Sequence, residues 1–135
     1  LTARCISRPD EKQIKKKVQR WQKISDNAAS QSRRGIIPQV KDMMTLKEAS
    51  NVCNSFDKAI VFYECGGDKL RDIIDEDIKT LAMFVGSEGG FEESEIDILK
   101  ANGVTPTTLG TRILRAQTAP IAGITAVMYQ TKNLE

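Results

Sequence analysis

The chain has 135 residues, a length that is enough for one hydrophobic core, so we expect a single domain. Its formal net charge is +2. Its 40% hydrophobic and 28% charged residues are ordinary for a globular protein, and no apolar run approaches the roughly 18 residues that a membrane span needs. The absence of histidine excludes Ser-His-Asp and Cys-His catalysis. The three cysteines, Cys5, Cys53 and Cys65, have no CxxC spacing. They therefore favour buried thiols in a cytoplasmic protein over disulfides or a metal site.

The first expected element is a long basic helix. Pro9 and Asp10 form a start signal, apolar residues recur at helical spacing over 10–34, and Gly35 is expected to end the helix. Residues 1–40 carry ten Lys and Arg against three Asp and Glu, whereas residues 41–135 carry ten against fifteen. The basic face either contacts phosphate backbones or is a solvated helix face, and charge leaves both readings open.

Helices and strands alternate in the rest of the chain. Strands that alternate with helices favour an α/β fold with a mainly parallel sheet and helices on both faces. The expected elements are an extended link or edge strand at 36–40, a helix at 45–54 capped by Thr45 and Glu48, a strand at 58–63, a turn at 64–67, a short helix at 68–77, a strand at 80–85, a helix at 92–101, a strand at 104–109 and a helix at 117–132.

Two turns that follow expected strands are the candidates for a ligand pocket. The first, at residues 86–90, contains Gly86, Gly89 and Gly90, and the second begins at Gly110. In open α/β sheets, small molecules bind where strands end. The first turn has neither the Gly-Lys-Ser/Thr ending of a Walker A loop nor a GxGxxG pattern, which argues against a phosphate cradle. The alternative is that both turns are tight connections without a ligand.

The second turn leads into a segment that mixes basic and apolar side chains. Arg112 and Arg115 stand beside Ile113 and Leu114. Without a ligand, the arginines would form surface ion pairs. We expect Ile113 and Leu114 to reach the core in either case.

Together these segments resemble the SPOUT class of methyltransferases. FVGSEGGFEESEI at 84–96 and LGTRILRAQTA at 109–119 are similar to the GPEGGF-type loop and the LGxRILRxETA segment of the bacterial family that methylates N3 of a uridine in small-subunit ribosomal RNA. TARC at 2–5 and the basic helix before Pro38 are similar to the N-terminal part of that family. The resemblance covers nearly the whole chain.

The resemblance implies a fold, a cofactor and partners. The fold is an α/β domain with a C-terminal trefoil knot, the cofactor is S-adenosylmethionine, and the partners are small-subunit ribosomal RNA and a second copy bound through the last helix, with no metal. Arg112 is the first candidate for stabilising charge on the uracil or binding RNA phosphate, followed by Arg4 and Arg34. The implied cofactor-binding residues are Phe62, Tyr63, Glu64, Val85, Gly86, Glu88, Gly89, Gly90, Leu109, Gly110, Ile113, Leu114 and Thr118.

The resemblance also bears on the extent of the chain. It implies that residues 1–135 are an N-terminally truncated methyltransferase domain without the PUA-like RNA-binding domain of the family. Ala3, Ser87, Gln117 and Pro120 depart from its usual residues, which affects cofactor affinity and substrate orientation more than the fold. Two alternatives remain: an enzyme of this class that modifies another RNA, such as transfer RNA, and a non-catalytic knotted module for RNA binding or ribosome assembly.

Overall fold

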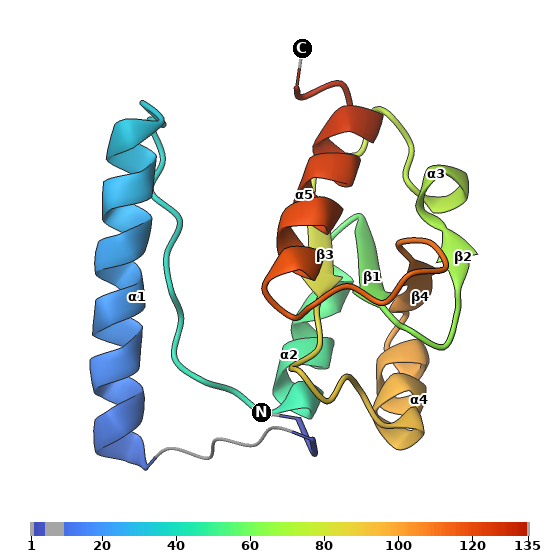
Figure 1. Ribbon diagram of the computed structural model, residues 1–135, viewed down its shortest axis with the longest axis horizontal. Coiled ribbons are helices and arrows are strands. Elements are labelled where there is room, and N and C mark those ends of the chain that lie inside the picture. Colours follow the sequence, from blue (N-terminus) through green and yellow to red (C-terminus); the bar gives the residue numbers. More distant parts are fainter. Residues whose placement is uncertain (1, 5–9, 135) are drawn as a thin grey trace. The chain divides into compact units, whose positions relative to one another are not determined.

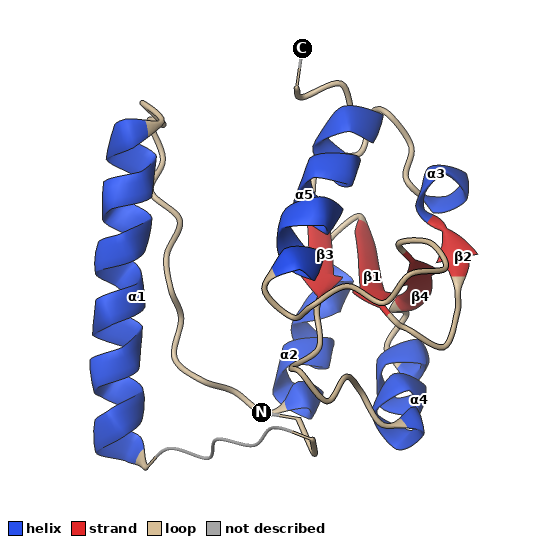
Figure 2. Ribbon diagram, in the orientation of Figure 1, coloured by secondary structure: helices blue, strands red, loops and turns tan. Residues whose placement is uncertain are grey.

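The computed structural model describes residues 2–4 and 10–134 (Figures 1 and 2). The described residues fall into two compact units, one at 10–44 and the other at 45–134 together with 2–4. Each unit is described by itself below. Nowhere in the described ranges does a helix combine the length and apolar character needed to cross a membrane.

The first unit is built on helix α1, Glu11–Gln31. Asp10 caps it, because its carboxylate accepts the Gln13 N–H at 2.8 Å while the Gln13 side chain accepts the Asp10 N–H. The expected end at Gly35 is wrong, since the residue after the cap with a left-handed backbone is Arg33, with φ of 55°. Residues 36–40 form an extended link and no strand. This link lies along α1, where Ser25 Oγ donates to the Pro38 carbonyl at 2.7 Å.

The second unit contains a parallel sheet, as the sequence predicts. Within residues 45–134 the sheet has four strands in the order β2-β4-β1-β3, and every neighbouring pair is parallel. The strands are β1 (Lys58–Phe62), β2 (Asp68–Lys69), β3 (Leu81–Phe84) and β4 (Thr105–Thr108). β2 lies where the sequence predicts only helix.

Helices cover both faces of this sheet, as predicted. Successive side chains of a strand point to opposite faces, so Val61 packs with Ile96 and Leu99 while Ile60 packs with Ile74. The first face is covered by α2 (Leu46–Val52), which a 3₁₀ turn at Cys53–Ser55 extends, and by α4 (Glu93–Ala101). The second face carries α3 (Leu70–Ile73) and α5 (Thr118–Gln130). Pro120 lies in the first turn of α5, as expected.

Close approach of α5 to the sheet depends on Gly123. A Cβ added at this buried glycine would lie 2.8 Å from Cζ of the Phe62 ring, which is itself in the core. Phe62 belongs to β1, so this contact fixes the middle of α5 against the carboxyl end of a central strand.

Gly123→Ala is expected to destabilise the fold. Helix propensity alone would stabilise the variant by about 1 kcal/mol. Overpacking against Phe62 should outweigh that gain and lower the free energy of unfolding by about 1–3 kcal/mol. Urea denaturation decides between the two effects, because their signs differ: a stabilised variant would contradict close packing of α5 on β1.

Candidate functional site

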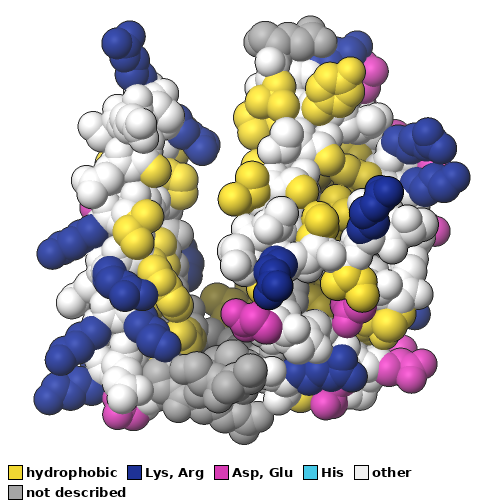
Figure 3. All heavy atoms as spheres, in the orientation of Figure 1, with side chains coloured by type: hydrophobic (Ala, Val, Ile, Leu, Met, Phe, Trp, Pro, Cys, Tyr) yellow, Lys and Arg dark blue, Asp and Glu magenta, His cyan; other side chains and the backbone are white. Residues whose placement is uncertain are grey.

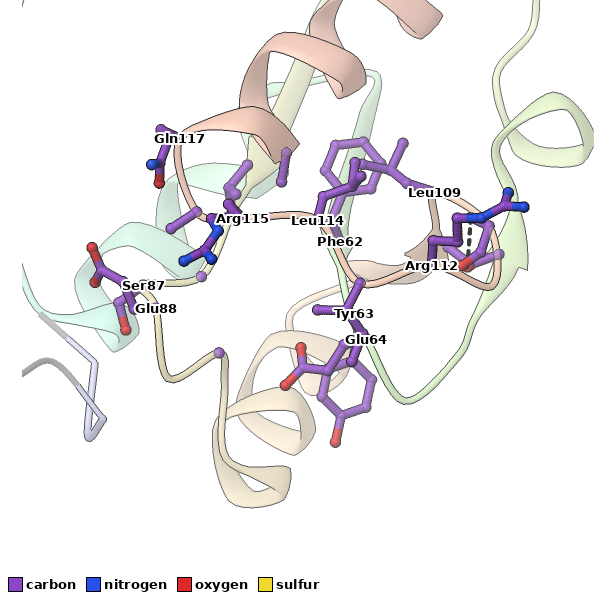
Figure 4. Close-up of a pocket in the computed structure, with 18 of the residues that line it drawn as sticks. Phe62, Tyr63, Glu64, Ser87, Glu88, Leu109, Arg112, Leu114, Arg115 and Gln117 are labelled. Atoms are coloured by element: carbon purple, nitrogen blue, oxygen red, sulfur yellow. Dashed lines mark hydrogen bonds between the residues drawn. The ribbon is translucent and has the colours of Figure 1, made fainter.

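A cavity of about 590 Å³ lies where the strands of the second unit end (Figure 4). It is lined by residues 62–64 after β1, residues 85–90 after β3, and residues 108–117 with Ala119 after β4. Parallel strands end at the same edge of a sheet, which is why these three loops converge. The two glycine-bearing turns predicted to share a pocket therefore do line one cavity.

The 86–90 loop folds tightly on itself. The Gly90 N–H donates to the Ser87 carbonyl at 2.9 Å, and Gly90 has a left-handed backbone with φ of 67°. A Cβ at Gly90 would lie 2.9 Å from Cδ of Glu64, and a Cβ at Gly86 would lie 3.0 Å from the Gly90 Cα. The left-handed backbone at Gly90 and the close approach of the backbone at Gly86 thus already favour glycine at both positions, beyond the space for a ligand that the sequence suggests.

Gly89 has a different role, because the N-terminal residues of the second unit pack against it. A Cβ there would lie 2.9 Å from Cβ of Arg4, whose Nη1 donates to the Gly89 carbonyl at 3.0 Å. The neighbouring Ala3 N–H donates to Oε1 of the buried Glu95 at 2.7 Å, and Glu95 Oε2 accepts the Glu92 N–H at 2.9 Å. Residues 3 and 4 are thereby fastened to the 86–90 loop and to the start of α4.

The segment after β4 supplies both arginines of the cavity wall. Arg112 and Arg115 line the cavity, and neither forms an ion pair with another described residue, so the ion-pair alternative lacks support. In Figure 4 their guanidinium groups extend to opposite sides of the segment. The expected place of Ile113 in the core is wrong: its side chain is 82% exposed at the cavity, whereas Leu114 is half-buried.

Charges of both signs and apolar groups meet at this cavity. Glu64 and Glu88 add carboxylates to the wall that also carries the two guanidinium groups, and Phe62, Leu109 and Leu114 add apolar surface. A hydrogen bond with the Cys65 thiol raises the pKa of Tyr63, so its phenol is neutral at physiological pH. Such a wall suits a ligand that combines a flat apolar part with a zwitterionic part.

Most candidate residues lie at the cavity. The cofactor-binding candidates all line it except Thr118, the first residue of α5, whose N–H donates to the Arg115 carbonyl at 2.8 Å. Among the arginine candidates, Arg112 lines it, Arg4 contacts the 86–90 loop at Gly89 without lining the cavity, and Arg34 belongs to the first unit. The lining residues that the sequence analysis did not assign individually are Ser87, Thr108, Thr111, Arg115, Ala116, Gln117 and Ala119, and all but Thr108 and Ala119 lie in the loops at 85–90 and 109–118 that the resemblance implies for the cofactor.

The unassigned residues are contiguous with assigned ones, so loop membership was the signal that could have found them. Ser87 is distinctive among them: its buried hydroxyl has no hydrogen-bond partner among the described residues. An orphaned hydroxyl in a loop at the cavity wall is open to a hydrogen bond from a bound molecule or water.

The cysteines and possible metal ligands add little to this site. The expectation of burial is right for Cys53 and wrong for Cys65, which is exposed in the turn after β1, and Cys5 lies outside the described residues. Within the described part of the chain, no group of three or more Cys, Asp or Glu side chains is arranged to hold a metal ion.

Comparison with known proteins gives concordant similarities. Residues 1–128 match the family of the RNA methyltransferase domain. The ribosomal RNA small subunit methyltransferase E of Bacillus subtilis (strain 168) is 35% identical over 139 residues, which cover 98% of this chain and 54% of the relative. The chain thus spans about half the length of the curated relatives it matches.

Two solved structures are similar in fold. One is the ribosomal RNA small subunit methyltransferase E of Neisseria gonorrhoeae bound to S-adenosyl methionine, with 32% identity, a TM-score of 0.82, and coverage of 96% of this chain and 52% of that one. The other, a Legionella pneumophila protein described as a methyltransferase with bound cofactor SAM, has 26% identity, a TM-score of 0.89 and the same coverage.

Proposed function

Since the chain belongs to the family of the RNA methyltransferase domain, we propose that it methylates small-subunit ribosomal RNA with S-adenosylmethionine as cofactor. Residues 1–135 then correspond to the methyltransferase domain of the longer relatives. The observation that carries this proposal is the convergence of three strand-ending loops on one cavity, in a chain similar in sequence and fold to a cofactor-bound relative.

The residues around the cavity fit this cofactor. The volume of about 590 Å³ lies within the range of about 300–1,000 Å³ for small-molecule sites. Leu109 and Leu114 offer an apolar wall for an adenine ring, while Glu64 and Arg115 offer charges that complement an amino-acid zwitterion. When bound, S-adenosylmethionine supplies an electrophilic methyl group on a sulfonium sulfur.

The protein residues then position a base and stabilise charge. We propose N3 of a uridine as the acceptor, which must lose its imide proton and leaves negative charge on the uracil oxygens. The Arg112 guanidinium, at the cavity wall and without an ion-pair partner among the described residues, is available to stabilise that charge. Because base pairing hides N3, the uridine must be unpaired or flipped out of its helix.

Two structural features complete the proposal. The C-terminal segment is proposed to be threaded as a trefoil knot, and α5 is proposed to form the contact between two copies of the chain. The second point is supported by large apolar side chains that α5 leaves exposed, with exposed fractions of 69% for Ile121, 49% for Ile124 and 76% for Tyr129. Sedimentation equilibrium is expected to give twice the mass of one chain; a monomer at all concentrations would contradict this contact.

Transfer of a labelled methyl group tests the function directly. Unmodified small-subunit ribosomal RNA and transfer RNA are incubated separately with the protein and labelled S-adenosylmethionine, and the nucleosides are separated after digestion. Label in 3-methyluridine from ribosomal RNA is the expected result. Label from transfer RNA alone would identify an enzyme acting on another RNA. Cofactor binding without any transfer would identify a non-catalytic module.

A further inference from the structure

Helix α1 separates its charged and apolar residues onto opposite faces. Its basic stripe is formed by residues that recur at helical spacing and are all exposed: Lys12, Lys16, Arg20 and Lys23. The opposite side carries Ile14, Val18 and Trp21. Figure 3 shows Lys and Arg side chains along α1, with apolar side chains gathered on another side of the helix.

The positive charge of the basic stripe is not neutralised within the described chain. No ion pair between described residues involves any of its four members. The two acidic residues of α1 are Glu11, in the first turn, and Asp26, which accepts a hydrogen bond from Gln22 Nε2 at 2.8 Å. Like charges four residues apart on a helix repel each other, so the stripe weakens α1 unless an anion binds there.

The basic stripe is also left open by the rest of its unit. The extended link after α1 is held on a different side of the helix, through Ser25 and through Gln22, whose Oε1 accepts the Val40 N–H at 2.8 Å. The stripe therefore stays accessible to a large partner while the link covers a neighbouring side.

We propose that the basic stripe binds the phosphate backbone of the RNA, independently of its sequence. Residues four apart on a helix are separated by about 6 Å, which lets successive basic side chains reach neighbouring phosphates of one strand. An anionic membrane would instead require a broad exposed apolar face. On α1 the exposed large apolar side chains of that side are Trp21 and Ile24. Ile14 and Val18 are half-buried, so the exposed apolar surface is narrow. This inference rests on the proposed function in taking RNA as the substrate.

Neutralising the stripe tests the proposal. In the full chain, Lys12, Lys16, Arg20 and Lys23 are replaced together by glutamine, which keeps nearly the same helix propensity. Anisotropy of labelled single-stranded RNA from the small subunit is expected to show about 200-fold weaker binding at 150 mM salt. The slope of log K against log salt should become shallower by about 3, since each lost phosphate contact contributes about 0.7.

A control variant separates the stripe from net charge. It replaces four exposed lysines elsewhere, Lys41, Lys47, Lys79 and Lys100, by glutamine and so removes the same charge. Its RNA affinity is expected to stay within about twofold of the original chain. Equal losses in both variants, or no loss in the stripe variant, would overturn the proposal.

Two further measurements complete the test. Stripe-dependent binding to phosphatidylserine vesicles with unchanged RNA affinity would assign the stripe to membranes and also overturn the proposal. Affinity for S-adenosylmethionine should be the same in all variants. If the original chain neither binds cofactor nor transfers methyl groups but loses RNA affinity with the stripe, the proposed function fails while this inference stands.

Discussion

Gly90→Ala is expected to weaken binding of S-adenosylmethionine about a hundredfold, equivalent to about 2.7 kcal/mol. Gly90 has a left-handed backbone, and the new methyl group would collide with the Glu64 carboxylate at the cavity wall. The Glu64 side chain must therefore swing away, and with it a carboxylate proposed to hold the cofactor, while the strained backbone at residue 90 disturbs the 86–90 loop. Titration calorimetry with the cofactor measures the loss.

Gly103→Ala is the matched control for this change. Gly103 also has a left-handed backbone, with φ of 77°, but it follows α4 and a Cβ there would meet nothing within 4 Å. It should lose about 1–2 kcal/mol of stability through backbone strain and keep its cofactor affinity. Similar affinities for both variants would show that the loop does not hold the cofactor.

Arg112→Ala is expected to lower the rate of methyl transfer by about 100- to 1,000-fold, the usual effect of removing one group that stabilises transition-state charge. Cofactor affinity should change less than about threefold, because the proposed partner of Arg112 is the uracil. Single-turnover rates at saturating cofactor and RNA measure this effect apart from binding. Arg112→Lys should recover part of the rate, since it keeps the charge but not the planar fork.

Arg115→Ala provides the comparison within the same segment. Arg115 lines the same cavity, but its guanidinium extends to the other side of the segment (Figure 4). Its loss should weaken cofactor binding more than it slows transfer. If Arg115→Ala abolishes transfer and Arg112→Ala does not, the catalytic role assigned to Arg112 is wrong.

Local patterns were sufficient to predict most elements. The capping box of Thr45 and Glu48 forms as expected, with the Thr45 N–H donating to Glu48 Oε2 at 2.7 Å, and β1, β3, α4 and α5 lie within the predicted ranges. β2 was not predictable from its own residues. Both are exposed, and the strand exists only because it pairs with β4, as in Asp68 with Thr107.

The location of the cavity was predictable from the sequence, but the contacts and the exposure of particular residues around it were not. Strand-ending glycine turns mark the ligand edge of a parallel sheet, and this placed the two loops correctly. The contact between Gly89 and Arg4 joins residues far apart in the chain, so no local sequence pattern predicts it. The same holds for Ile113, whose apolar character predicted burial although the turn after β4 leaves it exposed.

The central claim is that residues 62–64, 85–90 and 108–119 together enclose the cofactor. Amide spectra of ¹⁵N-labelled protein, recorded during titration with S-adenosylhomocysteine, test it residue by residue. Saturable shifts confined to these three segments and their neighbours are the predicted result. Shifts centred elsewhere, or none at millimolar ligand, would contradict it.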